Sequence, residues 1–263
     1  IYEILPAMAG CQAVIVSGIE ATLRNGIVKA CIDQDVNCYF IPHTGDIIIA
    51  GAQHLQSFSI PIMCARRAMP RPEYAIAKRG LDVLLAAMGL VIASPFMLIT
   101  AIAIKACDHG PVFYRQVRLT KDGKTFEILK FRSMRVDAEK DGVARLAADH
   151  DDRITPVGRV IRAIRLDELP QIFNILRGDM SVVGPYPETV ENAVKYGKNH
   201  PEYSYRLSVK AGLTGYAKVH GKYSSSRSNR LKMDFYYIQN YSFAMDLGIL
   251  AATLKVLFEP KRK

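Results

Sequence analysis

The sequence lacks the residue patterns that mark metal-binding and disulfide-bonded proteins. Its 263 residues include only five cysteines, which are scattered and form no C-x-x-C pair and no metal-ligand spacing. An odd, unclustered set is typical of a reducing compartment, where thiols act as small buried hydrophobic groups. We also find no signal peptide, internal repeat or low-complexity tract. These absences disfavour a zinc-stabilised module and a secreted, disulfide-bonded protein.

Acidic residues are fewer than basic ones over the whole chain, 25 against 35, but basic residues are scarce at the N-terminal end. Residues 1–64 contain two basic and five acidic groups, a net charge of −3, whereas residues 65–263 carry +13. A basic block beside apolar segments points to anionic partners such as lipid headgroups, phosphates or nucleic acid. The chain begins at Ile1 rather than Met, so we expect that it is a fragment of a longer protein.

Charge is absent altogether from residues 83–104. A helix of this length could cross a hydrocarbon core about 30 Å thick. Its middle holds Ser94 and Pro95, and proline removes a helical hydrogen bond. Basic residues flank both ends, and the segments before and after both resemble cytosolic sequences. We therefore expect a re-entrant membrane helix over 81–106, hinged at Ser94 and Pro95; the alternative is a straight transmembrane helix with a proline kink.

The residues before this segment alternate between strand and helix patterns. Predicted strands fall at 13–16, 37–41, 47–49 and 60–63, and a predicted helix at 20–33. This order favours a parallel sheet, and residues 1–64 are interpreted as the C-terminal part of a Rossmann-like domain. Since G-x-G-x-x-G is missing, a scaffolding or regulatory role is favoured over nucleotide binding. Residues 65–80 form a basic linker suited to a membrane surface.

Residues 107–263 read as a compact domain of mixed structure. Two alternating segments, 112–116 and 126–132, flank a turn at 121–124 and predict a hairpin in which Lys130 and Arg132 share one face. A helical pattern covers 154–178, two prolines mark a rigid loop at 185–187, and 224–226 predict a turn. Residues 243–258 are almost wholly apolar and predict either a helix in the membrane interface or a buried core helix.

The densest cluster of chemically active residues lies at Asp167 and Glu168. These adjacent carboxylates follow three arginines at positions 159, 162 and 165. A carboxylate can attack phosphorus or hold a divalent cation, and guanidinium groups can neutralise phosphoryl oxygens. The plainer interpretation makes Asp167 a helix N-cap with Pro170 in the first turn. The two are compatible, because a helix N-terminus keeps a carboxylate ionised.

Seven motifs in a fixed order carry a family resemblance. They are GPVFYRQ at 110–116, KFRSM at 130–134, D-x-RIT-x-x-G at 151–158, LDELPQ at 166–171, GDMSVVGP at 178–185, KAGLTG at 210–215 and DFYY at 234–237. Together they resemble the bacterial sugar transferases, the monotopic polyprenyl-phosphate phosphoglycosyltransferases, over about residues 75–260. The N-terminal segment looks like the end of the Rossmann-like domain of the long members, which carry further transmembrane helices upstream.

The resemblance implies transfer of a sugar-1-phosphate from a UDP-sugar to undecaprenyl phosphate, with release of UMP, to prime polysaccharide synthesis. It implies that Asp167 is the nucleophile of a covalent phosphosugar intermediate, and that Asp167 and Glu168 lie at a Mg²⁺ ion. Implied substrate-binding residues are Lys130, Arg132, Arg162, Gln171, Pro185, Tyr186 and Asp234. The implied location is the cytosolic face of the bacterial inner membrane, in contact with membrane lipids and without nucleic acid, and long members suggest a homodimer.

One position departs from the family pattern. The family usually reads Gly-Pro-Arg-Pro where this chain has Tyr186, and tyrosine cannot pair with phosphate as arginine does. Arg177, Arg206 or the backbone N–H groups of the loop are the predicted replacements.

The predicted fold class is α/β: a partial Rossmann-like segment, a re-entrant membrane helix, and a compact α+β catalytic domain with interfacial amphipathic helices. Two other functions stay open, a membrane scaffold or regulator that has lost catalysis and a basic nucleic-acid-binding module, although no nucleic-acid motif is present. The sugar is not predicted, because related hexoses differ by single hydroxyl or acetyl contacts.

Overall fold

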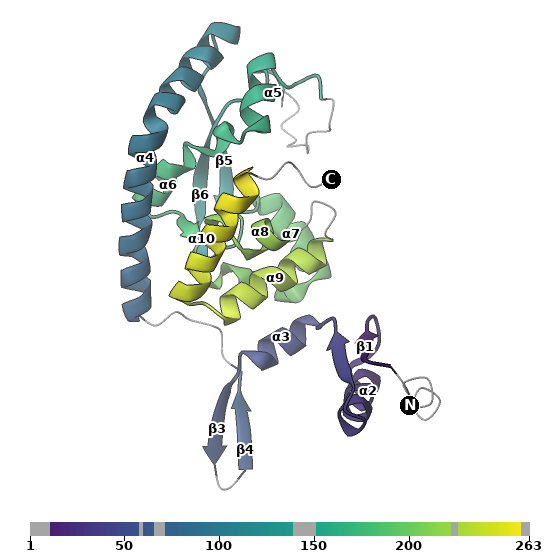
Figure 1. Cartoon of the computed structure of the whole chain (residues 1–263). Coiled ribbons are helices and arrows are strands. Elements are labelled where there is room, and N and C mark those ends of the chain that lie inside the picture. The colour runs from purple at the N-terminus through teal and green to yellow at the C-terminus, as the bar shows by residue number, and fades with distance from the viewer. Residues whose placement is uncertain (1–10, 58–59, 66–71, 139–150, 222–225, 259–263) are drawn as a thin grey trace. The chain divides into compact units, whose positions relative to one another are not determined.

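The computed structural model describes residues 11–57, 60–65, 72–138, 151–221 and 226–258 (Figure 1). It divides into two compact units, residues 1–63 and 64–263, which are described separately below.

The N-terminal unit contains a βαβ arrangement. Strand β1 (Ala13–Val16), helix α2 (Ala21–Asp33) and strand β2 (Asn37–Phe40) follow in order, and the two strands pair in parallel. The predicted parallel strands and the helix between them are confirmed. Val16, Ile27 and Cys31 form the buried side of this arrangement. Ile15 and Tyr39, which are partners in the register, are 79% and 60% exposed, so one face of the strand pair is bare.

The predicted strand at 47–49 is wrong, because these residues lie in helix α3 (Thr44–Ala50). The Asp46 carboxylate accepts a hydrogen bond from the His43 backbone N–H at 2.6 Å, which satisfies a free donor at the start of the helix. It also accepts one from Arg24 of α2 at 2.8 Å. These polar contacts stabilise the helix and outweigh the preference of three consecutive isoleucines for a strand. Strands β3 (Gln53–Ser57) and β4 (Ile60–Cys64) form a separate two-stranded sheet, and β3 was not predicted.

The C-terminal unit begins with one long helix, α4 (Pro72–Asp108), which includes residues 72–80 of the predicted linker. It is the one helix in the described part of the chain that is long and apolar enough to cross a membrane. It stays helical across Pro95, although proline has no N–H to donate to the carbonyl of Val91. The Ser94 hydroxyl donates to that carbonyl at 2.9 Å and so replaces the missing backbone hydrogen bond.

Helix α4 packs along the rest of its unit through one face. Ala86, Ala93, Met97 and Ile104 join the main core, while Val91, Ile92 and Ile99 on the other face are 65–74% exposed. The curved helix runs the length of this unit at one side (Figure 1).

A buried polar network fastens the first half of α4 to the last helix of the chain, α10 (Phe243–Phe258). The Asp246 carboxylate of α10 accepts hydrogen bonds from Lys78 at 2.6 Å, Tyr74 at 2.8 Å and Tyr237 at 2.8 Å. One turn after Lys78, the Asp82 carboxylate accepts from the Ser181 hydroxyl and the Val182 N–H at 3.0 and 2.9 Å. At the far end of α4, Asp108 forms an ion pair with Arg132.

The predicted hairpin is confirmed. Strands β5 (Phe113–Leu119) and β6 (Thr125–Phe131) pair antiparallel around the 3-10 turn η1 (Lys121–Gly123). The Ile128 and Phe131 side chains of β6 are buried against α4 and helix α6 (Gln171–Arg177). The hairpin therefore joins the membrane-type helix to the segment that holds Asp167 and Glu168.

The predicted helical stretch 154–178 consists of three short helices. These are α5 (Pro156–Ala163), the 3-10 turn η2 (Leu166–Glu168) and α6. Thr155 caps α5 by accepting from the Gly158 N–H at 2.9 Å. Arg165 has a left-handed backbone, with φ of 58°, and this reversal separates α5 from η2. Gly178 ends α6 with φ of 96°, a conformation that glycine adopts without strain.

The remaining elements surround a second parallel strand pair, β7 (Ser181–Val183) and β8 (Gly212–Thr214). Between and after them come α7 (Val190–Asn199), the 3-10 segment η3 (Pro201–Ser208), α8 (Tyr216–His220), α9 (Arg227–Gln239) and α10. Residues 224 and 225 of the predicted turn lie outside the described residues, and Ser226 caps α9. On α10, Asp246 and Ile249 are buried while Leu247 and Leu254 are exposed, so this helix has a core face and an exposed apolar face, and its place in the membrane interface stays a prediction.

Candidate active site

Asp167 and Glu168 lie in η2, between the reversal at Arg165 and the start of α6. Asp167 is inside this turn and occupies neither N-cap position, because Arg165 precedes η2 and Pro170 precedes α6. The interpretation of Asp167 as a plain helix N-cap is therefore wrong. Both carboxylates are half-buried, so they remain reachable from solvent while they feel the charges around them.

Lys218 of α8 is the closest cation to this pair that sequence reasoning missed. Its Nζ lies 2.8 Å from Oε2 of Glu168 and also donates to the carbonyl of Leu213 at 2.9 Å. The contact joins residues 50 positions apart in the chain. The signal that could have drawn attention to Lys218 is its place three residues after the KAGLTG motif.

The pKa values of the two carboxyl groups are shifted in opposite directions. Burial, and then the neighbouring Glu168, raise the pKa of Asp167, against the influence of Lys130 and Arg162. Burial acts in the same direction on Glu168, but Lys218 and Lys130 outweigh it, so the pKa of Glu168 is lowered. Glu168 is thus the firmly ionised member of the pair, and Asp167 is the member whose burial is less compensated by neighbouring cations.

Tyr186 lies beside two lysines of this cluster. Its hydroxyl and the Nζ of Lys130 are 3.1 Å apart, and its ring centroid lies 5.8 Å from that nitrogen and 5.5 Å from the Nζ of Lys218. Burial acts to lower the pKa of Lys130, but Tyr186 and Glu168 outweigh it, and the pKa of Lys130 is raised. Position 186, where the family usually has arginine, is therefore occupied by an aromatic ring that makes cation–π contacts with the ammonium groups of Lys130 and Lys218.

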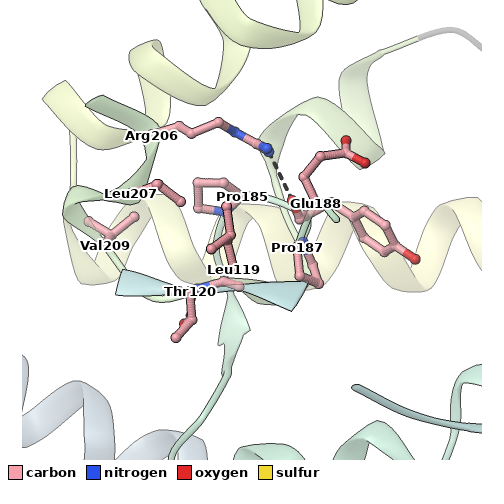
Figure 2. A pocket seen from close by; sticks show the side chains of 10 residues that line it. Leu119, Thr120, Pro185, Pro187, Glu188, Arg206, Leu207 and Val209 are labelled. Atoms are coloured by element: carbon pink, nitrogen blue, oxygen red, sulfur yellow. Dashed lines mark hydrogen bonds between the residues drawn. The ribbon is translucent and has the colours of Figure 1, made fainter. Parts of the chain in front are cut away.

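Two arginines fix the loop that carries Tyr186 through its backbone carbonyl groups. Arg206 of η3 donates to the carbonyl of Tyr186 at 2.9 Å (Figure 2). Arg118 of β5 donates to the carbonyl of Pro187 at 3.1 Å. Figure 2 shows Pro185 and Pro187 in the lining of a shallow hollow, between Arg206 on one side and Leu119 on the other. The two prolines and the two arginines together make this loop rigid.

Arg206 has no free capacity for a diphosphate. It is 8% exposed, its Nε and Nη2 donate to Oδ2 of Asp234 at 3.1 and 2.8 Å, and its Nη1 donates to the Tyr203 hydroxyl at 2.6 Å. The prediction that Arg206 replaces the missing arginine is therefore wrong. Arg177, the other predicted replacement, stands at the far end of α6, about 9 Å along the helix from Gln171.

The structure brings only some of the predicted site residues together. Asp167 has Glu168, Lys130 and Arg162 as neighbours, and Tyr186 lies beside Lys130 and Lys218, the two lysines that also act on Glu168. Asp234 is buried against Arg206, and Arg132 is buried against Asp108 at the end of α4, so both pair with partners outside this cluster. Gln171 is fully buried at the start of α6, and its side-chain amide has no hydrogen-bond partner among the described residues. Ser94 and Pro95 lie within α4.

The described residues contain no group of three or more His, Cys, Asp or Glu side chains that could hold a metal ion. The acidic oxygens at this site come from Asp167 and Glu168. Mg²⁺ is commonly bound by one or two carboxylates, with substrate phosphates and waters completing the octahedron. Two adjacent carboxylates, one of them with a lowered pKa, fit that kind of site better than an all-protein cage.

Comparisons with known proteins identify the family of this chain. A family model described as bacterial sugar transferase matches residues 73–260. A UDP-N-acetylgalactosamine-undecaprenyl-phosphate N-acetylgalactosaminephosphotransferase of Aeromonas hydrophila is 44% identical over 192 residues, which cover 72% of this chain and 45% of that protein. A UDP-glucose:undecaprenyl-phosphate glucose-1-phosphate transferase of Caulobacter vibrioides is 40% identical over 194 residues, 72% of each chain.

A shorter relative, the exopolysaccharide production protein PSS of Rhizobium leguminosarum, is 36% identical over 189 residues, which cover 68% of this chain and 94% of that protein. By contrast, the chain spans about half the length of several other curated relatives that it matches. Two of those matches run over 240 and 259 residues and so extend into the N-terminal unit.

Proposed function

This chain belongs to the bacterial sugar transferase family, and we propose that it transfers a sugar-1-phosphate from a UDP-sugar to undecaprenyl phosphate and releases UMP. The observation that carries the proposal is the half-buried Asp167–Glu168 pair among Lys130, Arg162 and Lys218. The relatives are named for glucose and N-acetylgalactosamine, so the donor proposed here is a UDP-hexose or UDP-N-acetylhexosamine. The product would prime polysaccharide synthesis.

Asp167 is the proposed nucleophile. Its carboxylate oxygen attacks the phosphorus that bears the sugar, the bond from that phosphorus to the bridging oxygen breaks, and UMP departs with the electron pair. The raised pKa of Asp167 supports this role, because a poorly solvated carboxylate is a more reactive one. Lys130, Lys218 and Arg162 neutralise the phosphoryl oxygens.

Glu168, together with Asp167, is the proposed holder of Mg²⁺. Such an ion neutralises the diphosphate and makes UMP a better leaving group. The lowered pKa of Glu168 supports this assignment, because a metal ligand must be deprotonated. Lys218 also keeps Glu168 oriented through the contact at 2.8 Å.

We propose further that α4 enters the membrane and returns on the cytosolic face. Both of its ends bind the same unit, the first through Lys78 and Asp246 and the second through Asp108 and Arg132. A helix that crossed about 30 Å of hydrocarbon would place these two ends in opposite aqueous phases. The exposed apolar face of α4 would then contact lipid. Ser94 and Pro95, across which the helix is continuous in this structure, would be the position at which it bends.

Labelling tests this topology. In a variant whose only cysteines are the native, exposed Cys107 and a new one from Glu73→Cys, a membrane-impermeant maleimide should reach both from the cytosolic side of inverted vesicles. Labelling of one position from each side would indicate a spanning helix instead.

The reaction is tested by UMP release from a panel of UDP-sugars with purified protein, Mg²⁺ and undecaprenyl phosphate. Release with one sugar, which is lost in Asp167→Asn, is the expected result and names the donor. Equal release by the wild type and Asp167→Asn would remove Asp167 from the mechanism. The absence of release with every sugar, from folded protein, would favour the scaffold alternative.

A further inference from the structure

A second, shallow hollow lies beside the acidic pair. Arg165, Thr214, Lys218, Val219, Thr253 and Val256 line it. Arg165 comes from the reversal before η2, Thr214 from β8, Lys218 and Val219 from α8, and the last two residues from α10. Because Lys218 also contacts Glu168 at 2.8 Å, the hollow opens next to the proposed reaction centre. Neither Lys130 nor Tyr186 lines it, so it is distinct from the hollow of Figure 2 and from the side of the cluster that holds the tyrosine.

The polar part of this hollow suits a phosphate monoester. Arg165 and Lys218 supply two positive charges, and Arg165 acts on Glu168 strongly enough to help lower its pKa. The Thr253 hydroxyl donates to the carbonyl of Ile249 at 2.7 Å, so Thr214 is the donor in its own 2.7 Å contact with Thr253, and both hydroxyl protons are engaged within the protein. Recognition of phosphate oxygens therefore falls to the guanidinium and ammonium groups, which proteins commonly use for this purpose.

The surroundings of the hollow are apolar on two sides. On α10, the residues next to Thr253 and Val256 belong to an outer face on which Leu247 and Leu254 are 57% and 60% exposed. On the other side, Ile164 directly precedes Arg165 and is 59% exposed, and Val160 one turn earlier is 60% exposed. A nucleotide sugar offers no large apolar group to such surfaces, whereas a lipid-linked phosphate does.

We propose that this hollow binds the phosphate of the polyprenyl phosphate acceptor, with Arg165 as a phosphate ligand and the outer faces of α5 and α10 in contact with the first isoprene units. The inference rests on the proposed function. In the second half of that reaction, an oxygen of the acceptor phosphate forms a bond to the phosphorus held on Asp167. The bond from that phosphorus to the aspartyl oxygen breaks, the carboxylate is regenerated, and the product is a lipid-linked diphosphosugar.

The test separates acceptor binding from donor chemistry. Arg165→Gln keeps a side chain at the left-handed position. Arg159→Gln removes an equal charge from an exposed position about 100° around α5 from Val160, outside the face that Val160 and Ile164 form, and is the matched control. Binding of radiolabelled undecaprenyl phosphate to the full chain in detergent micelles, without UDP-sugar, should weaken about tenfold in Arg165→Gln, which corresponds to one charge-assisted contact. Arg165→Lys should recover part of the affinity, and Arg159→Gln should leave it unchanged.

A kinetic measurement complements the binding assay. The stoichiometric burst of UMP that the enzyme releases without acceptor should be equal in the wild type and Arg165→Gln, while the KM for undecaprenyl phosphate rises about tenfold in steady state. Val256→Phe, which fills the hollow without a change of charge, should raise the same KM and leave the burst intact.

Three results would overturn the proposal: equal effects of Arg165→Gln and Arg159→Gln, which would indicate general attraction to anionic surfaces; a smaller burst in Arg165→Gln, which would assign Arg165 to the donor diphosphate; or displacement of the lipid by a tenfold excess of phosphatidylglycerol. If the wild type releases no UMP at all, the proposed function fails, and the binding assay still decides whether the hollow takes a polyprenyl phosphate.

Discussion

Two groups of charged side chains in the C-terminal unit differ in how completely they are paired. The group around Asp246 is buried: the side chains of Asp246 and Lys78 are 1% and 7% exposed, and the carboxylate accepts three hydrogen bonds. In the group around Asp167, Glu168 and Lys218 are 21% and 22% exposed. Asp167 there has a raised pKa and neighbouring cations, but no hydrogen bond from a side chain is among its influences.

The difference separates charges that hold the fold from charges that are ready for a ligand. A buried pair with all of its partners is costly to break, because the remaining charge has no solvent and no replacement. A pair that is partly exposed keeps coordination capacity for phosphate or metal, and its loss costs the fold less than the loss of a fully buried pair. The same distinction explains Arg206 and Asp234. The family resemblance implied Asp234 as a substrate ligand and Arg206 was a predicted replacement for the missing arginine, but the structure pairs the two with each other behind the loop of Tyr186.

The sharpest test of this distinction is Asp167→Asn. If Asp167 forms the covalent intermediate, UMP release should fall by about a thousandfold or more, and no sugar-phosphate adduct should appear in the mass of the protein. The midpoint of thermal unfolding should stay within about a degree, because a half-exposed carboxylate contributes little to stability. Asp152→Asn, at an exposed carboxylate, is the matched control and should retain activity.

The opposite outcome is expected for the buried group. Asp246→Asn or Lys78→Met should lower the free energy of unfolding by about 3–5 kcal/mol, because either change leaves a buried partner without its counter-charge. The double variant, Lys78→Met with Asp246→Leu, should recover part of that loss. Chemical denaturation in detergent measures all three. If the single changes have no effect on stability, the network around Asp246 does not fasten α4 to α10.

Glu168→Gln should have an intermediate effect that falls on the metal requirement. The amide is a weaker ligand and no longer pairs with Lys218, so the Mg²⁺ concentration for half-maximal activity should rise about 10-fold to 100-fold. Chelation of Mg²⁺ should abolish UMP release in the wild type. An unchanged Mg²⁺ titration curve in Glu168→Gln would assign the ion to other ligands, whereas Lys218→Met, with the carboxylate intact, should shift that curve less.

The smallest effect is expected for Tyr186→Phe. It removes the hydroxyl that contacts Lys130 at 3.1 Å but keeps the ring beside Lys130 and Lys218. One neutral-to-charged hydrogen bond of this exposure contributes about 1 kcal/mol, so kcat/KM should fall about fivefold. Tyr186→Ala removes the ring as well and should cost more. Equal kinetics in the wild type, Tyr186→Phe and Tyr186→Ala would show that position 186 does not contribute.

Local pattern predicted a good part of the fold. The parallel strands at 13–16 and 37–40, the hairpin of 113–131 and the long apolar helix all follow from periodicity and from the absence of charge. The misplaced strand at 47–49 shows the limit of that reasoning. Isoleucines there have high β propensity, but Asp46 caps a helix and pairs with Arg24, and tertiary contacts of that kind override propensity.

The site divides in the same way. The sequence by itself determined the family, because the order of the motifs along the chain can be read without the fold. It also determined that Asp167 and Glu168 are adjacent and follow several basic residues. Only the tertiary structure decided which cations reach them. Lys218 meets Glu168 across 50 positions, and Arg206 turns to Asp234 and away from the site. Ion pairs between distant segments depend on how helices and loops pack, and no local periodicity records that packing.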